Sequence, residues 1–218
     1  MRSKPRHAPK ERPPDPHAAD SNWRLFIAIP IPPAAQTLIA TLTEMLDAGS
    51  PPVRWTATGS AHLTLHFLGE VDPARAELLR LSFSSIAGPQ PGFDLTTDRL
   101  GCFPDEGPPR VVWLGLSGDT RELTSFHRAL GLSLRKIAIE SEDRSFRPHV
   151  TLGRIRDDAS NLAAEALRTR ILEPAINQLC YDEFATIPVH QIQLVRSYLE
   201  RTGTRHEVIA VSNLRSVD

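Results

Sequence analysis

The feature that most constrains this chain is a four-residue pattern, His-apolar-Thr-apolar, that occurs twice. The first copy is His62-Leu63-Thr64-Leu65, and the second is His149-Val150-Thr151-Leu152, 87 residues further on. Polar and apolar residues alternate in both copies, as they do in a half-buried strand. Only about 0.1 copies of this pattern are expected by chance in a chain with eight histidines, so two copies in matching surroundings indicate an internal duplication. A chain built this way is expected to fold as two related halves that face each other.

The chain around these motifs alternates between strand and helix patterns. Asp72 and Pro73 predict the start of a helix, as N-cap and first residue, and Gly88 predicts its end. Other helices are expected between Pro33 and Gly49 and near 119–139 and 158–172, and strands near 23–29, 62–68, 93–99, 110–116, 148–153, 190–198 and 204–212. The order lacks the strict β-α-β-α rhythm of a parallel sheet, so the predicted class is α+β.

The start of the chain differs in composition from the rest. Residues 1–20 contain five prolines and eight charged residues but only four hydrophobic ones. Such a segment buries too little apolar surface to offset the entropy lost on ordering. We therefore expect a disordered tail over 1–21 and a single folded domain over 22–218.

Composition and charge exclude several classes of protein. A net charge of −1 and a pI of about 6.7 argue against a broad basic surface for nucleic-acid backbone. The longest apolar runs, Leu25–Ile29 and Val111–Leu114, are far shorter than the roughly 18–20 residues that cross a bilayer. The N-terminus has no apolar secretory signal, and two cysteines, Cys102 and Cys180, indicate buried thiols rather than a disulfide scaffold. A cytoplasmic protein that does not bind membranes is expected.

Each motif places an imidazole and a hydroxyl on the same face of a strand. Because strand side chains alternate, His62 and Thr64 face one way, and Phe67 faces the other way with the neighbouring leucines. His149 and Thr151 share a face in the same manner. If the two halves face each other, two imidazoles and two hydroxyls meet in one cleft.

Two opposed imidazoles suit an in-line displacement at phosphorus. A neutral histidine takes a proton from the attacking oxygen, while a protonated one gives a proton to the leaving oxygen. An unperturbed pKa of about 6.5 makes both forms accessible near neutral pH. Threonine hydroxyls can donate hydrogen bonds to the phosphate oxygens. This chemistry requires no cofactor and no metal, and none is expected.

A shared metal ion is the main alternative, because strict alternation places His66 on the same face as His62. Four residues of strand separate these two side chains by about 13 Å, too far for ligands that lie about 2 Å from one zinc ion. His66 is therefore expected to be a partly exposed polar residue. Alternation would also turn Arg154 away from the second motif, unless Gly153 bends or bulges the strand.

The motif blocks resemble the 2H phosphoesterases, specifically the RNA 2′,3′-cyclic phosphodiesterases, also called 2′-5′ RNA ligases. The resemblance covers about residues 23–213, and the segments that carry it are 24–29, 53–55, 62–69, 101–103, 110–115 and 148–154. It implies a bilobal fold of antiparallel sheets with flanking helices, related by a pseudo-twofold axis through a central cleft.

The resemblance also implies a reaction and a role for each site residue. Members of the family open a terminal 2′,3′-cyclic phosphate of RNA with water and leave a 2′-phosphomonoester. His62 would be the proton donor to the departing 3′ oxygen, and His149 would be the acceptor that activates water. The phosphate would be held by Thr64, Thr151 and Arg154, so the strand must bend near Gly153. The implied partners are RNA 3′ ends or nucleotides that carry the cyclic phosphate, and the protein is expected to be a monomer.

Three other activities stay open from the sequence. The same site could join a 5′-hydroxyl to a cyclic phosphate, which is 2′-5′ ligation. It could act on a small nucleotide, such as a cyclic phosphate of an ADP-ribose derivative. It could also bind a nucleotide or an RNA end without turning it over.

Overall fold

The computed structural model describes residues 22–48, 51–88, 90–141, 145–171, 184–200 and 203–215. In chain order the elements are β1 (Trp23–Pro30), α1 (Pro33–Asp47), β2 (Val53–Trp55), the 3₁₀ turn η1 (Thr58–Ser60), β3 (His62–Val71), α2 (Pro73–Ala87), β4 (Phe93–Phe103), β5 (Val111–Gly118), α3 (Thr120–Lys136), β6 (Val150–Ile155), α4 (Asn161–Ile171), β7 (Thr186–Val189), β8 (Gln191–Glu200) and β9 (Gly203–Asn213). The predicted α+β class is confirmed. The expected tail over 1–21 and Cys180 lie outside the described residues.

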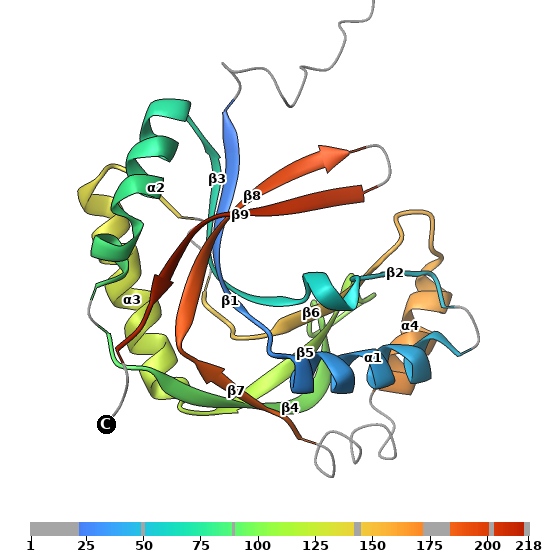
Figure 1. The fold of residues 1–218 in the computed structure, drawn as a ribbon. Helices are drawn as coiled ribbons and strands as arrows, with labels where there is room; N and C mark the ends of the chain where they lie inside the picture. Colours follow the sequence, from blue (N-terminus) through green and yellow to red (C-terminus); the bar gives the residue numbers. More distant parts are fainter. Residues whose placement is uncertain are drawn as a thin grey trace, which may run out of the picture.

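The strands form one curled antiparallel sheet that has two halves (Figure 1). Its order is β7-β4-β5-β6-β3-β1-β8-β9, and β2 pairs with β6. The first half contains β3, β1, β8 and β9, and the second contains β7, β4, β5 and β6. Among the described residues a single register pair, Leu63 with Val150, joins β3 to β6. The two motif strands are therefore the inner strands of the two halves.

Within the described ranges, helices α1 to α4 pack on the two halves, and none of them covers the other face of the sheet. Figure 1 shows α2 and α3 along one half and α1 and α4 along the other. In the first half α2 packs on β9, and in the second α1 packs on β7 and α4 on β4. None of the helices in the described ranges is long and apolar enough to cross a membrane. The face without helices is the one on which the site lies.

The main core lies between the helices and the sheet. Its fully buried members include Ile27, Leu63, Leu79 and Leu114. Burying an aliphatic side chain of this size contributes about 1.5–3 kcal/mol, so this layer dominates the stability of the fold. A small second cluster, Phe26, Ala28 and Val195, is packed separately from this core.

The boundaries of α2 follow the predicted capping residues. The Asp72 carboxylate accepts a hydrogen bond from the backbone N–H of Arg75 at 3.1 Å, and Pro73 is the first helical residue. Gly88 follows the last turn with φ of 72°, a conformation that favours glycine. This helix was fully predicted because both ends depend on local contacts.

A β-bulge in β3 corrects the predicted faces of His66 and Phe67. The register between β1 and β3 slips by one residue after Ile27, so strict alternation is interrupted. His66 is only 5% exposed, and its Nε2 lies 2.9 Å from the carbonyl oxygen of His127 on α3. Phe67 is 44% exposed, and its ring centroid lies 6.0 Å from that of Phe26. The expectation of a partly exposed His66 on the face of His62 was wrong.

Candidate functional site

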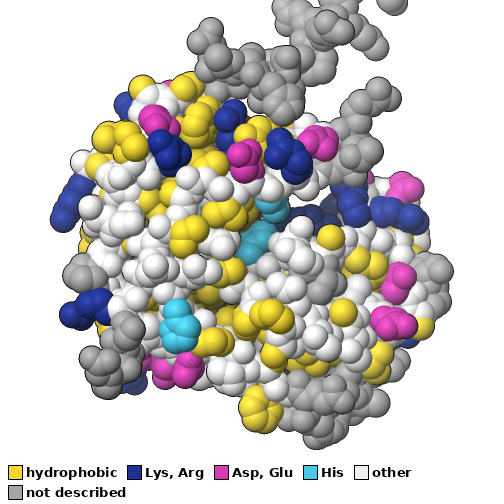
Figure 2. All heavy atoms as spheres, in the orientation of Figure 1, with side chains coloured by type: hydrophobic (Ala, Val, Ile, Leu, Met, Phe, Trp, Pro, Cys, Tyr) yellow, Lys and Arg dark blue, Asp and Glu magenta, His cyan; other side chains and the backbone are white. Residues whose placement is uncertain are grey.

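The two motifs meet where the halves of the sheet join. Leu63 and Val150, the apolar residues that form the joining pair, are 1% and 0% exposed. His62 and His149 directly precede them, so each lies one residue from the joint, on the opposite face. Figure 2 shows histidine side chains gathered in a hollow in the middle of the molecule, with basic side chains beside them.

The two threonines lie crosswise to the two histidines. In an antiparallel pair, the residue before one partner faces the residue after the other. His62 is therefore directed toward Thr151, and Thr64 toward His149. All four side chains are half-buried. The sequence predicted this convergence, and the register of one pair accounts for it.

Both imidazoles are held by the same local contact. Nδ1 of His62 lies 2.8 Å from the carbonyl oxygen of Ser60, and Nδ1 of His149 lies 2.7 Å from that of Arg147. A carbonyl oxygen only accepts, so Nδ1 donates in each ring. The neutral ring then carries its lone pair on Nε2, and this nitrogen can accept a proton or, when protonated, donate one.

Burial lowers the pKa of both imidazoles. In His62, desolvation is the main cause; its backbone hydrogen bond opposes the shift, and the charges of His206, His149 and Arg154 add to it. In His149, desolvation again leads, opposed by the hydrogen bond to Arg147, and the guanidinium groups of Arg154 and Arg147 add to the shift. These electrostatic interactions indicate that His62, His149 and Arg154 lie close to one another in the site.

Each imidazole contacts an aromatic ring on its own half. Phe26 of β1 stacks on His62, with ring centroids 4.8 Å apart and an interplanar angle of 25°. Phe103, at the end of β4, meets His149 edge-on at 5.0 Å and 88°. These contacts restrain the rings and exclude water from one side of each, which agrees with the direction of their pKa shifts.

Trp113 of β5 extends the aromatic wall beside His149. Its ring lies 5.2 Å from Phe103 and 6.5 Å from His149. Its partner across the β4–β5 pair is Gly101, and a Cβ atom at that position would overlap the indole. Glycine is therefore required at position 101 for Trp113 to lie where it does.

A second bulge directs Arg154 toward the site. Thr151 pairs with Trp113, whereas Arg154 pairs with Val111, so three residues of β6 span two residues of β5. The extra residue resets the alternation, and Arg154 shares the face of Thr151. The bend expected at Gly153 is present in the structure.

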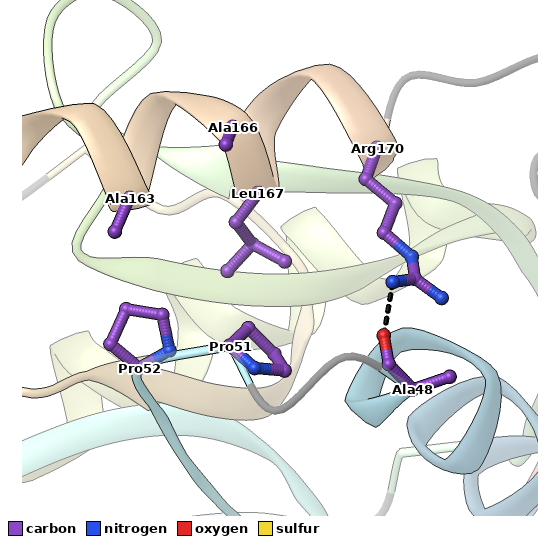
Figure 3. Close-up of a pocket in the computed structure, with 7 residues that line it drawn as sticks. All are labelled: Ala48, Pro51, Pro52, Ala163, Ala166, Leu167 and Arg170. Carbon is purple, nitrogen blue, oxygen red and sulfur yellow. Dashed lines mark hydrogen bonds between the residues drawn. The ribbon is translucent and has the colours of Figure 1, made fainter.

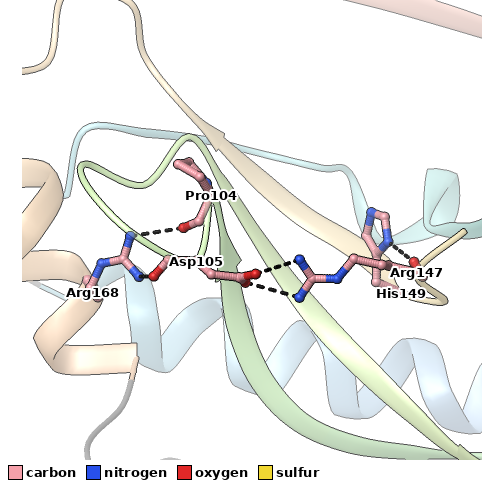
Figure 4. Close-up of polar contacts among 5 residues, drawn as sticks. All are labelled: Pro104, Asp105, Arg147, His149 and Arg168. Carbon is pink, nitrogen blue, oxygen red and sulfur yellow. Dashed lines mark hydrogen bonds and ion pairs between the residues drawn. The ribbon is translucent and has the colours of Figure 1, made fainter. Parts of the chain in front are cut away.

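A polar network supports the segment that carries His149 (Figure 4). The Asp105 carboxylate accepts two hydrogen bonds from Arg147, at 2.8 and 3.0 Å, which hold the pKa of Asp105 below its usual range. Arg168 of α4 donates to the carbonyl oxygens of Pro104 and Asp105, at 3.0 and 2.9 Å. Arg147 also provides the carbonyl oxygen that accepts from His149. The orientation of His149 is thus linked to the loop after β4 and to α4.

His206 of β9 lies at the site although the sequence analysis did not select it. Its ring centroid is 5.4 Å from that of His62 and 5.0 Å from that of Phe26. No motif surrounds His206, and it reaches His62 only because β8 and β9 extend the sheet beyond β1. A tertiary contact of this kind leaves no local signal in the sequence.

A pocket of about 280 Å³ lies elsewhere, between the end of α1 and α4 (Figure 3). It is lined by Ala48, Pro51, Pro52, Ala163, Ala166, Leu167 and Arg170. Arg170 is its one charged lining residue, and its guanidinium donates to the carbonyl oxygen of Ala48. This lining offers no acid, base or nucleophile. Within the described ranges, no three His, Cys, Asp or Glu side chains are grouped as metal ligands either.

Comparison with known protein sequences gives consistent matches. Residues 29–113 match the LigT-like phosphoesterase family. The RNA 2′,3′-cyclic phosphodiesterase of Aeropyrum pernix is 31% identical over 181 residues, which cover 81% of this chain and 97% of that protein. The RNA 2′,3′-cyclic phosphodiesterase of Escherichia coli K12 is 35% identical over 138 residues, which cover 62% of this chain and 74% of that protein.

Solved structures share the same fold. TT0787 of Thermus thermophilus superposes with a TM-score of 0.70 at 23% identity, covering 88% of this chain and 98% of that chain. E. coli LigT in complex with 3′-AMP gives a TM-score of 0.63 at 28% identity, with the same coverage. The curled antiparallel sheet with four helices is common to them. Together these matches show that the chain belongs to the LigT-like phosphoesterases of the 2H group, the family of the RNA 2′,3′-cyclic phosphodiesterases.

Proposed function

We propose that this protein hydrolyses the 2′,3′-cyclic phosphate at the end of an RNA or a nucleotide to a 2′-phosphomonoester. His62 is the proton donor and His149 the proton acceptor. The observation that carries this proposal is the placement of two imidazoles, each with Nδ1 bound to a carbonyl oxygen, on either side of the pair that joins the halves. In-line displacement needs one proton-transfer group on the side of attack and another on the side of departure.

The reaction follows from this arrangement. Nε2 of His149 takes a proton from water as the water oxygen attacks phosphorus. The bond from phosphorus to O3′ breaks, and Nε2 of His62 gives its proton to O3′. The bond to O2′ stays, so the product carries a 2′-phosphate and a 3′-hydroxyl. The two imidazoles then exchange one proton with solvent to restore the starting state.

The remaining site residues stabilise the phosphate. The hydroxyls of Thr64 and Thr151 donate to the non-bridging oxygens, on which charge is concentrated in the transition state. Arg154, on the same face of β6, contributes a positive charge. Together they supply the electrostatic stabilisation that a metal ion gives in other phosphodiesterases.

Surface chemistry supports the assignment of donor and acceptor. Four residues are consecutive partners across β3, β1, β8 and β9: Phe67, Phe26, Val195 and Val208. We call this row the apolar shelf. It adjoins His62, and a base or sugar stacked on it places the ribose on that side. The departing O3′ belongs to the ribose, so the nearer imidazole is the donor, and His149 is left for water.

The decisive experiment is product analysis with a nucleoside 2′,3′-cyclic phosphate. The expected product is the 2′-monophosphate, and His62→Ala and His149→Ala should each lower kcat by about 10²- to 10⁴-fold. His190→Ala is a matched control, because His190 is exposed and lies between β7 and β8, away from the motifs. A 3′-monophosphate would show that the leaving oxygen is misassigned, and binding without turnover would reduce the protein to a binding module.

A comparison of long and short substrates distinguishes activity on RNA ends from activity on small nucleotides. We expect oligonucleotide substrates to be turned over with higher kcat/KM than mononucleotides, because an RNA end adds contacts beyond the cyclic phosphate. In the reverse reaction, the same groups would join a 5′-hydroxyl to the cyclic phosphate. Water at about 55 M outcompetes dilute RNA ends, so hydrolysis is expected to dominate over ligation.

A further inference from the structure

We propose that His206 is a positioning residue of this reaction, which closes a three-ring cluster with Phe26 and His62 and competes with the donor ring for a proton. The inference rests on the proposed function of the site. It adds a residue that determines how readily the donor releases its proton.

The contacts of His206 are with the donor ring and its aromatic neighbour. His206 meets His62 edge-on at 5.4 Å and 75°, and meets Phe26 edge-on at 5.0 Å and 70°. Phe26 in turn stacks on His62 at 4.8 Å. Each ring of the cluster therefore contacts the other two, and edge-to-face contacts of this kind are attractive and directional. A change at position 206 acts directly on the position of His62.

The neighbours of His206 on β9 are engaged in other contacts. Arg205 pairs with Glu200 at 2.9 Å between Nε and Oε1, and Glu207 accepts from the hydroxyl of Tyr198 at 2.7 Å. Strand alternation turns both away from the face that His206 occupies. His206 itself is exposed, and its ring makes no hydrogen bond or ion pair within the described part of the chain. The imidazole is thus the group that this stretch of β9 presents to the site.

The charged groups that face His62 come from two strands. Arg154 of β6 and His149, which directly precedes β6, face it from the second half, and His206 faces it from β9. The neighbour from β1 is the uncharged ring of Phe26. Among these charges, His206 contributes most to the lowered pKa of His62, after desolvation as the main cause.

The charged groups around His206 are few on its own face. Its cross-strand partner is Ser197, which carries no charge. The next charged side chains on this face of the sheet are Arg24 and Glu70. Arg24 lies two residues from Phe26 on β1, and Glu70 is its register partner on β3. The pKa of His206 is lowered by desolvation. Because the two rings are in contact, a positive charge on His206 disfavours a positive charge on His62.

This coupling has a direct effect on the reaction. A charged His206 makes protonated His62 a stronger acid, which eases the transfer of its proton to O3′. Without that charge, His62 keeps its proton to higher pH. The high-pH limb of the activity profile reports loss of the donor proton. This limb should then move to higher pH. The low-pH limb belongs to His149 on the other half and should stay in place.

The test compares three variants by their pH profiles of kcat/KM on a nucleoside 2′,3′-cyclic phosphate. His206→Phe keeps a ring but removes its titration, and it should move the high-pH limb to higher pH. His206→Ala should show the same movement and, because it also loses the ring contact, a kcat lower by about two- to tenfold. His190→Phe, remote from the cluster, should superimpose on the parent. A His206→Phe profile identical to the parent profile would overturn the proposal.

A second measurement does not depend on turnover. NMR titration of the His62 ring in the whole protein without substrate, assigned with His62→Ala, should give a higher pKa in His206→Phe than in the parent. No change would overturn the coupling even in an active enzyme. A change in a protein that fails to hydrolyse cyclic phosphates would instead support the coupling and refute the proposed function.

Discussion

His62 and His149 share their hydrogen-bond pattern but differ in the side chains around them. His62 is surrounded by rings, with Phe26 stacked on it and His206 edge-on. Next to His149 lie Phe103 and Trp113, and the Arg147 guanidinium covers the face of Phe103 at 4.3 Å. One surrounding suits a nucleoside and the other suits an anion and its attacking water, which matches the proposed division into donor and acceptor.

These two side chains predict the pH dependence of the free enzyme. In the proposed mechanism the reactive form has His62 protonated and His149 neutral, and this form is most populated midway between their two pKa values. Burial lowers both pKa values below 6.5, so kcat/KM should be highest below pH 6.5. The maximum of kcat should lie at higher pH, because the charge of bound phosphate raises both pKa values. A maximum of kcat/KM above pH 7 would contradict this.

At the scale of elements, local signals predicted the helices and failed where the backbone slips. Capping residues such as Asp72 predicted the bounds of α2, because helix ends depend on neighbouring residues. Alternation predicted the faces of the motif residues but not that of His66, since a bulge in β3 has no residue signature there. At Arg154 the corresponding bulge could be expected, because Gly153 marked it. Strands β2 and β7 were not predicted, as three or four residues are too few to show a period.

The bulge in β3 creates a stack of three rings that links β3, α3 and the segment before β6. His66 of β3 stacks on His127 of α3 at 4.1 Å and 11°, and His127 stacks on Phe146 at 3.9 Å and 9°. A Cβ atom at Gly131 would lie 3.1 Å from Cε1 of His66, so a helical glycine makes room for this ring. Phe146 lies three residues before His149, and the stack therefore joins the segments that carry both motifs.

This stack should make the protein acid-sensitive. Desolvation and the neighbouring His66 lower the pKa of His127 to about 4, against about 6.5 in the unfolded chain. Between pH 4 and pH 6.5 the unfolded chain binds more protons than the folded chain. The contribution of His127 to the free energy of unfolding is therefore fully present above pH 6.5 and is lost as the pH drops toward 4. Allowing for partial exposure, the loss is roughly 2 kcal/mol. Urea unfolding at pH 7 and pH 4.5 should show a smaller loss in His127→Phe, and equal losses would refute this role.

At the scale of the whole molecule, the duplicated motif predicted two halves and their convergence. The sequence did not show that the halves form one continuous sheet, because a single pair between β3 and β6 has no pattern of its own. It also did not show that His206 comes from the far strand of the first half. Such contacts depend on how the sheet curls, and no local sequence feature encodes them.

The complete site predicts activity without a divalent metal. In the proposed mechanism two imidazoles transfer the protons, and the threonine hydroxyls with Arg154 stabilise the phosphate. Hydrolysis of a nucleoside 2′,3′-cyclic phosphate should therefore keep its rate after dialysis against EDTA. Addition of Mg²⁺ or Zn²⁺ to the dialysed protein should not raise it. A loss of more than about tenfold that a divalent ion restores would contradict the mechanism.

The contact between Leu63 and Val150 has a consequence for how sequences of this kind can change. His62 and His149 each lie one residue from that contact, so the spacing between the two rings depends on the interstrand distance at this pair. Helices and outer strands can then accumulate substitutions without altering the gap that phosphorus must fill. Natural variation is expected to be wide at the periphery and narrow at this joint.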